Sequence, residues 1–127
     1  MNIFDKLKEM KLLVIDDDEW IRDSLSLFFE HEGCDLHAVE TAEEGLRELG
    51  KEDFDIIISD YRLPGIDGLE FFHAIEKSHG DCLKILITAY GTDDVVTQAY
   101  KTGVQDVIHK PFSVEAIEKS LSRLMVE

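Results

Sequence analysis

The sequence predicts an α/β fold built on one open parallel sheet, and three observations lead to this prediction. Short apolar runs alternate along the chain with longer stretches of helical periodicity. The runs are apolar at almost every position, which is typical of strands that are buried on both faces. Each run is also followed by an acid, a hydroxyl or an amine. The four clearest runs are 11–15, 54–59, 83–87 and 106–109.

The first two strands and the helix between them follow from apolar spacing. The run 11–15 is the first strand, and the acids Asp18 and Glu19 after it favour a helix N-terminus. This helix has one apolar stripe at i, i+4 and i+7, formed by Ile21, Leu25 and Phe28. Gly33 is the residue type that commonly ends a helix. We expect a short second strand around 36–39.

The next two helices are indicated by their starting signals. Residues 41–44, Thr-Ala-Glu-Glu, match a capping box. The helix that they open should bury one face, made of Ala42, Leu46 and Leu49. Residues 64–68, Pro-Gly-Ile-Asp-Gly, form a loop after the third strand. The following helix has its apolar residues at Leu69, Phe72 and Ile75.

The last two helices flank the fifth strand. Thr92 or Asp93 can cap the first of them, and Gly103 can end it. Its residues available for burial are Val95, Val96, Ala99 and Tyr100. The final helix starts at Ser113 and has a single apolar stripe of Val114, Ile117, Leu121 and Leu124.

These elements make a β-α unit that is repeated five times. Right-handed crossovers place helices on both faces of a parallel sheet, so the expected architecture is a doubly wound (βα)5 three-layer sandwich. We predict the flavodoxin-like strand order 2-1-3-4-5. Because no linker or internal repeat divides the chain, we expect one domain over 1–127, with its core at about 11–125.

Composition limits the classes of function. The 28 acids and 13 bases give a net charge of −15, which repels nucleic-acid phosphates and anionic membranes. We therefore expect no direct nucleic-acid or membrane partner. No apolar segment approaches the roughly 18 residues of a membrane span, and the first ten residues lack a signal-peptide core, so we expect a cytoplasmic protein. Cys34 and Cys82 are far apart and lack metal-ligand spacing, which predicts reduced thiols.

Chemically active side chains follow the strands that should be neighbours. In the order 2-1-3-4-5, Asp16 and Asp17 come next to Asp60, at the sheet edge where ligands bind. Adjacent carboxylates need a proton or a cation, and Mg²⁺ prefers oxygen ligands. Thr88 and Lys110 end the fourth and fifth strands, where a hydroxyl and an ammonium can contact a phosphoryl group. Together these groups suit the formation and breakage of an aspartyl phosphate.

At this point the residues match a known family. The chain resembles the receiver domain of two-component response regulators from about Lys11 to Met125, and chemotaxis regulators are among the proteins it is similar to. The matching motifs occur in the same order as in the family, and they are Asp16-Asp17, Asp60 with Pro64 and Gly68, Thr88-Ala89, and Lys110-Pro111-Phe112.

The resemblance implies a function and a set of partners. Asp60 would accept a phosphoryl group from the phosphohistidine of a sensor histidine kinase or a histidine phosphotransfer protein. The chain would catalyse its own phosphorylation and dephosphorylation rather than act as an enzyme on other substrates. It would signal to an output domain or effector through the face that the family forms from its fourth helix, fifth strand and fifth helix. A phosphorylation-dependent homodimer is also compatible with the resemblance.

The resemblance also assigns roles within the site. It implies that the ligands of Mg²⁺ (or Mn²⁺) are Asp17, Asp60, the backbone carbonyl of Arg62 and, usually through water, Asp16. Thr88 would swing toward the phosphoryl group and Lys110 would pair with it. The Lys110-Pro111 peptide would be cis.

The chain departs from the family at positions that affect signalling. Val107 stands where receivers usually carry an aromatic residue that follows the movement of the threonine. We therefore expect the switch to depend on the backbone of residues 89–92, where the small Ala89 leaves room for movement. Arg62 and Tyr90 occupy variable positions, and their bulk could shield the phosphate from water and prolong the signal.

Two alternative functions remain open at this stage. One is a phosphatase with an aspartate nucleophile, which Asp16-x-Asp18 resembles. In such enzymes, however, the nucleophile follows the first strand, and 127 residues leave no room for their cap. The other is a phosphorylation-independent interaction module with a vestigial acid cluster. The residues do not identify the kinase, the output or whether a longer regulator contains this chain.

Overall fold

Five parallel strands form a single sheet in the order β2-β1-β3-β4-β5, which confirms the predicted fold class and strand order. The computed structural model describes residues 2–89 and 91–125. The strands are β1 (Lys11–Ile15), β2 (Asp35–Val39), β3 (Ile56–Asp60), β4 (Leu83–Thr88) and β5 (Asp106–His109).

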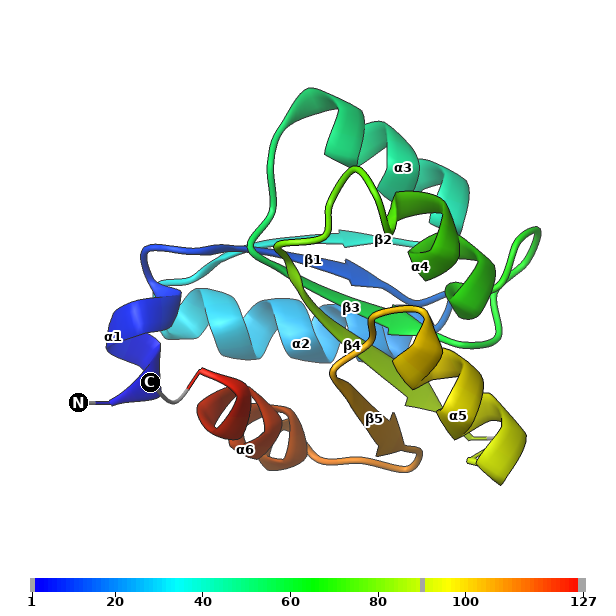
Figure 1. Cartoon of the computed structure of the whole chain (residues 1–127). Helices are drawn as coiled ribbons and strands as arrows, with labels where there is room; N and C mark the ends of the chain where they lie inside the picture. Colours follow the sequence, from blue (N-terminus) through cyan, green and yellow to red (C-terminus); the bar gives the residue numbers. More distant parts are fainter. Residues whose placement is uncertain (1, 90, 126–127) are drawn as a thin grey trace.

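Helices cover both faces of this sheet and make a three-layer structure (Figure 1). One layer contains α1 (Ile3–Leu7), α2 (Glu19–His31) and α6 (Val114–Leu124). The opposite layer contains α3 (Ala42–Lys51), α4 (Gly68–Ile75) and α5 (Asp93–Lys101). The fourth helix, fifth strand and fifth helix of the sequence prediction correspond to α5, β5 and α6.

Alternation of side chains along the central strands explains the two cores. In β1, Leu12 and Val14 point into the core beneath α1, α2 and α6, whereas Leu13 and Ile15 point into the opposite core. Successive side chains of a strand face opposite sides of its sheet, so continuous apolar runs fill both layers. All five residues of β3 are buried, so the strand that carries Asp60 is covered on both faces.

A polar side chain caps the N-terminus of every helix in the described part of the chain. The caps are Asn2, Asp18, Thr41, Asp67, Thr92 and Ser113. The box predicted at Thr41 is half formed, because Thr41 accepts from the Glu44 amide but no return bond is made. A complete capping box occurs instead at Asp67 and Glu70. Each cap satisfies an amide that has no partner within its helix.

Two predictions about which helical residues are buried were wrong. Leu46 is 37% exposed, and the buried face of α3 is centred on Gly45, between Ala42 and Leu49. Gly45 lies so close to Ile15 and Phe71 that a Cβ atom there would strike them, so the missing side chain lets α3 approach the sheet. The expected burial of Tyr100 on α5 is also wrong, because its side chain is 49% exposed.

The N-terminal helix α1 was not predicted from the sequence. Its Phe4 ring packs edge-on against the half-buried Phe28, at 5.6 Å between centroids. The Lys6 ammonium donates to the carbonyl of Met125 at 3.4 Å. The helix therefore contacts both α2 and the end of α6, beside which it lies in Figure 1.

Three smaller expectations can also be compared with the structure. The Lys110-Pro111 peptide is cis, as predicted. Cys34 and Cys82 are free, buried cysteines. Within residues 2–89 and 91–125, every helix is too short or too polar to cross a bilayer.

The packing of α1 predicts a large effect of a single substitution. Leu7 is fully buried, so Leu7→Ala should lower the free energy of unfolding by about 2–5 kcal/mol through lost burial and a residual cavity. The matched control is Leu27→Ala, because Leu27 is 74% exposed on α2 and should change stability by less than about 0.5 kcal/mol. Urea unfolding measures both. Equal effects of the two substitutions would show that α1 does not belong to the folded core.

Candidate functional site

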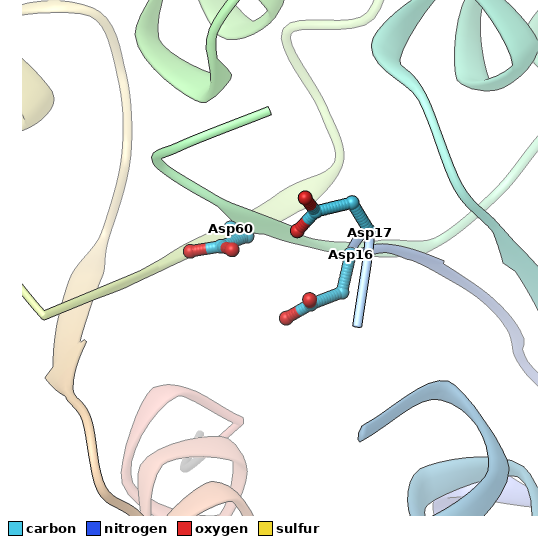
Figure 2. A group of neighbouring side chains, drawn as sticks. All are labelled: Asp16, Asp17 and Asp60. Carbon is cyan, nitrogen blue, oxygen red and sulfur yellow. The ribbon is translucent and has the colours of Figure 1, made fainter. Parts of the chain in front are cut away.

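Strand ends bring three carboxylates together at one edge of the sheet. Asp16 directly follows β1, and Asp60 is the last residue of β3. These strands pair with Ile15 opposite Ser59, so the two acids emerge side by side. Asp17 is the next residue, and one oxygen from each acid lies within 4.8 Å of the others. Figure 2 shows the three side chains grouped around a common space.

Asp16 is the most enclosed of these acids, with 1% of its surface exposed. Its Oδ1 accepts a hydrogen bond from the Asp18 amide at 2.9 Å. Its Oδ2 is buried and has no hydrogen-bond partner, although the Lys110 ammonium lies 3.4 Å away. Burial raises the pKa of Asp16 to about 6, and repulsion from Asp60 adds to the effect. The Asp18 amide and the Lys110 charge partly oppose this rise in pKa.

Lys110 holds a positive charge against the acids. Its Nζ donates to Asp60 Oδ2 at 3.0 Å. Burial raises the pKa of Asp60, while the hydrogen bond and charge of Lys110 lower it in part. Burial alone would lower the pKa of Lys110, but Asp60 and Asp16 together raise it above the ordinary lysine value. Lys110 is therefore a permanent cation in this site.

The donor set fits a hard divalent cation. Three carboxylates face one space, a single ammonium neutralises only part of their charge, and a buried oxygen of Asp16 lacks a hydrogen-bond partner. Asp17 is exposed, so its carboxylate is open to a metal that keeps several waters. Mg²⁺ and Mn²⁺ prefer such oxygen ligands, and both fit these residues.

The other predicted residues lie on β4, on β5 and in the loop after β4. Thr88 ends β4 and is fully buried, and its carbonyl accepts from the Lys110 amide at 2.8 Å. Val107 is half-buried on β5, where it pairs with Leu86 of β4. Strand β4 therefore lies between Val107 and the strand that carries Asp60. Ala89 is exposed at the start of the loop after β4. The structure thus links Thr88 directly to the backbone of Lys110.

Of the two residues expected to control phosphate lifetime, the structure describes only Arg62. Arg62 is exposed, two residues beyond Asp60. Tyr90 lies outside the described residues. The proposal that these two side chains shield a phosphate therefore remains a prediction.

The loop after Asp60 is closed by a short contact between backbones. The Gly68 amide donates to the Tyr61 carbonyl at 2.8 Å. A Cβ atom at Gly68 would collide with the carbonyl oxygen of Asp60, so only glycine allows α4 to begin this close to the phosphoacceptor candidate. Gly68 therefore helps to place Asp60.

Sequence reasoning missed one residue next to the acids. Arg22 lies on α2, and its guanidinium donates to the backbone carbonyl of Asp16 at 2.8 Å. Helical spacing does locate Arg22 near the start of α2, because it follows the N-cap Asp18 by four residues and so lies one helical turn beyond it. Its target is a backbone atom, however, which no residue pattern reveals.

Comparison with known proteins identifies relatives over most of the chain. A family model described as the response regulator receiver domain matches residues 12–122. The response regulator protein FleR of Pseudomonas aeruginosa is 34% identical over 113 residues, which are 89% of this chain and 24% of FleR. ResD of Bacillus subtilis, a transcriptional regulatory protein, is 30% identical over 95% of this chain and 50% of its own length. The chain thus spans about a quarter to half of these relatives.

Solved structures share the fold at similar coverage. The chemotaxis response regulator CheY4 of Vibrio cholerae superimposes with a TM-score of 0.85 at 26% identity, covering 91% of this chain and 98% of CheY4. The beryllofluoride-activated receiver domain dimer of NtrC4 gives a TM-score of 0.82 at 33% identity. That comparison covers 89% of this chain and 93% of the NtrC4 chain.

The raised pKa of Asp16 predicts how stability depends on pH when metal is absent. The folded protein resists ionisation of Asp16 until about pH 6, whereas the unfolded chain ionises near 3.8. Stability is therefore lost as pH rises through this window, by an amount on the order of 3 kcal/mol at about 1.4 kcal/mol per pKa unit. Asp16→Asn keeps the acceptor for the Asp18 amide but cannot ionise.

Urea unfolding in chelator at pH 4 and pH 7 tests this effect. Asp16→Asn should exceed wild type in stability at pH 7, and the advantage should shrink strongly at pH 4, where wild-type Asp16 is protonated. An advantage that is equal at both pH values would contradict the assignment of the penalty to Asp16 ionisation.

Proposed function

Since this chain belongs to the family of response regulator receiver domains, we propose that Asp60 is the phosphoacceptor of a two-component signalling pathway. The donor is the phosphohistidine of a sensor histidine kinase or of a histidine phosphotransfer protein. The observation that carries the proposal is the grouping of Asp60 with Asp16 and Asp17 around one space, with Lys110 bound to Asp60 at 3.0 Å.

The proposed transfer is a displacement at phosphorus. An oxygen of the Asp60 carboxylate forms the new P–O bond while the P–N bond to the donor imidazole breaks, and the imidazole leaves with its electron pair and takes up a proton. Negative charge is then spread over three phosphoryl oxygens. Lys110 lies close enough to Asp60 to neutralise one of them, and the Thr88 hydroxyl is the proposed donor to another.

The acids prepare this step by holding a divalent cation. We assign the ligands as Asp17, Asp60 and the Arg62 carbonyl, with Asp16 acting through water. Bound Mg²⁺ or Mn²⁺ supplies the positive charge that stabilises the phosphoryl oxygens. Burial raises the pKa of Asp60, and the hydrogen bond and charge of Lys110 oppose this rise, which favours the ionised nucleophile. A bound cation would act in the same direction.

The output is proposed to be a change in partner binding through α5, β5 and α6. Thr88 and Lys110 are joined by a backbone hydrogen bond, so a shift of Thr88 is proposed to move both the end of β5 and the loop 89–92. Val107 has no ring or hydroxyl to transmit this movement, and the loop backbone takes that role. The activated NtrC4 receiver is a dimer, which supports a phosphorylation-dependent homodimer here.

Relatives suggest the wider context of this domain. FleR, DctD and ResD are longer regulators, and several relatives are named as transcriptional regulatory proteins. We infer that residues 1–127 act as one cytoplasmic receiver domain, which controls an output domain or a separate effector.

Phosphorylation at Asp60 can be tested by mass. Incubation with Mg²⁺ and a small acyl phosphate should raise the intact mass by one phosphoryl group, and Asp60→Asn or chelation of the metal should abolish the increase. Asp53→Asn is the matched control, because Asp53 is exposed on the segment that precedes β3 and should label normally.

Labelling of Asp60→Asn at the wild-type rate would refute the nucleophile assignment. Hydrolysis of a phosphate ester that is lost in Asp16→Asn but kept in Asp60→Asn would favour the phosphatase alternative. Failure of the wild type to bind Mg²⁺ would favour an interaction module.

The signalling route predicts different effects at Thr88 and Val107. Val107→Ala should change phosphorylation and the affinity for the partner by less than tenfold, because its short side chain moves little. Thr88→Ala should still be phosphorylated but should no longer alter partner binding. Backbone amide NMR of α5, with and without beryllofluoride, reports the same coupling without a partner. If Val107→Ala uncouples as completely as Thr88→Ala, position 107 is part of the switch.

A further inference from the structure

The position of Asp17 is determined by its backbone. Asp17 is exposed, and no hydrogen bond or ion pair holds its carboxylate within the described part of the chain. Asp16, by contrast, is held through its carboxylate as well as its amide, which donates to the Val39 carbonyl at 3.1 Å. The peptide group that joins Asp16 to Asp17 therefore sets the point and the Cα–Cβ direction from which the Asp17 carboxylate extends.

Arg22 holds that peptide group. Its Nη1 donates to the Asp16 carbonyl oxygen at 2.8 Å, and its side chain is 19% exposed. The α2 helix fixes the base of the side chain, because the Arg22 amide donates to the Asp18 carbonyl at 3.1 Å. Arg22 thus connects a rigid helix to the turn that carries both acids.

Glu40 provides a second anchor for the guanidinium. Arg22 Nη2 lies 3.8 Å from Glu40 Oε2, and Glu40 directly follows Val39, whose carbonyl receives the Asp16 amide. The Asp16 backbone is therefore held at its amide by β2 and at its carbonyl by Arg22, and Arg22 also contacts the residue after β2. A planar guanidinium with several donors can span two acceptors in this way, whereas a lysine ammonium cannot.

We propose that Arg22 is a positioning residue that presets the Asp16–Asp17 turn for the divalent cation. The inference rests on the metal site of the proposed function and assigns this role to a residue that lies outside the acid cluster. Arg22 acts on the metal through Asp16 and Asp17 and touches neither the metal nor the phosphoryl group.

Position and charge predict opposite effects when Arg22 is removed. A guanidinium near the acids repels Mg²⁺, so if charge were its only effect, Arg22→Ala would bind Mg²⁺ more tightly. If Arg22 orders the turn, Arg22→Ala should bind more weakly, because the metal must then fix the Asp17 carboxylate itself. The direction of the change in affinity therefore separates the two roles.

The test is an NMR titration of the whole chain with Mg²⁺ alone, following the amides of Asp17 and Asp60. We expect the Arg22→Ala half-saturation to be about tenfold higher than that of wild type, or about 1.4 kcal/mol, which matches one hydrogen bond from a charged donor. Arg22→Lys should fall between the two. Arg47→Ala is the matched control, because Arg47 is exposed on α3 and its loss changes the net charge equally; its half-saturation should stay within twofold of wild type.

An Arg22→Ala half-saturation equal to or lower than that of wild type would overturn the proposal. If Arg22→Ala does not fold, the Mg²⁺ titration of Arg22→Lys is the test. A half-saturation of Arg22→Lys indistinguishable from that of wild type would then overturn the proposal. Absence of Mg²⁺ binding in the wild type would instead refute the metal site of the proposed function. Normal wild-type binding together with an unaffected Arg22→Ala would refute only the role of Arg22.

Discussion

The structure depends on the electrostatic balance between three carboxylates and one ammonium at the end of a parallel sheet. Asp16, Asp17 and Asp60 converge within a few ångströms, and Lys110 neutralises part of their charge. Burial makes this arrangement costly for the protein alone, as the raised pKa of Asp16 shows. Under the proposed function, a divalent cation bound among the three carboxylates would relieve this repulsion. The same repulsion would then supply part of the affinity for the metal.

The rest of the fold keeps this cluster in place. Strands β1 and β3 are buried on both faces, so they deliver Asp16 and Asp60 from rigid positions. Gly68 lets α4 begin against the Asp60 carbonyl, and Arg22 holds the turn after β1 from α2. On the far side, β5 presents Lys110, whose amide is bound to Thr88. The acids, Thr88 and Lys110 therefore follow or end four different strands, so the proposed switch could act on several elements at once.

Much of this arrangement could be predicted from the sequence because it depends on local patterns. Apolar runs locate strands buried on both faces, and parallel topology alone brings Asp16, Asp17 and Asp60 to one edge. The failures depend on tertiary packing. Leu46 lies outside the core because Gly45 approaches the sheet, and the short helix α1 is held by burial of Phe4 and Leu7. Hydrogen bonds to backbone atoms, such as that of Arg22, leave no pattern in the sequence.

The most direct test of the electrostatic account is the number of protons released when Mg²⁺ binds. Calorimetry in buffers with different ionisation enthalpies measures this number, because a metal that binds carboxylates displaces their protons. Near pH 6 the account predicts a release of about half a proton from Asp16, whose pKa is about 6. Near pH 8 the release should approach zero, because Asp16 is already ionised. Mg²⁺ binding without proton release at pH 6 would contradict the claim that repulsion among buried carboxylates drives metal binding.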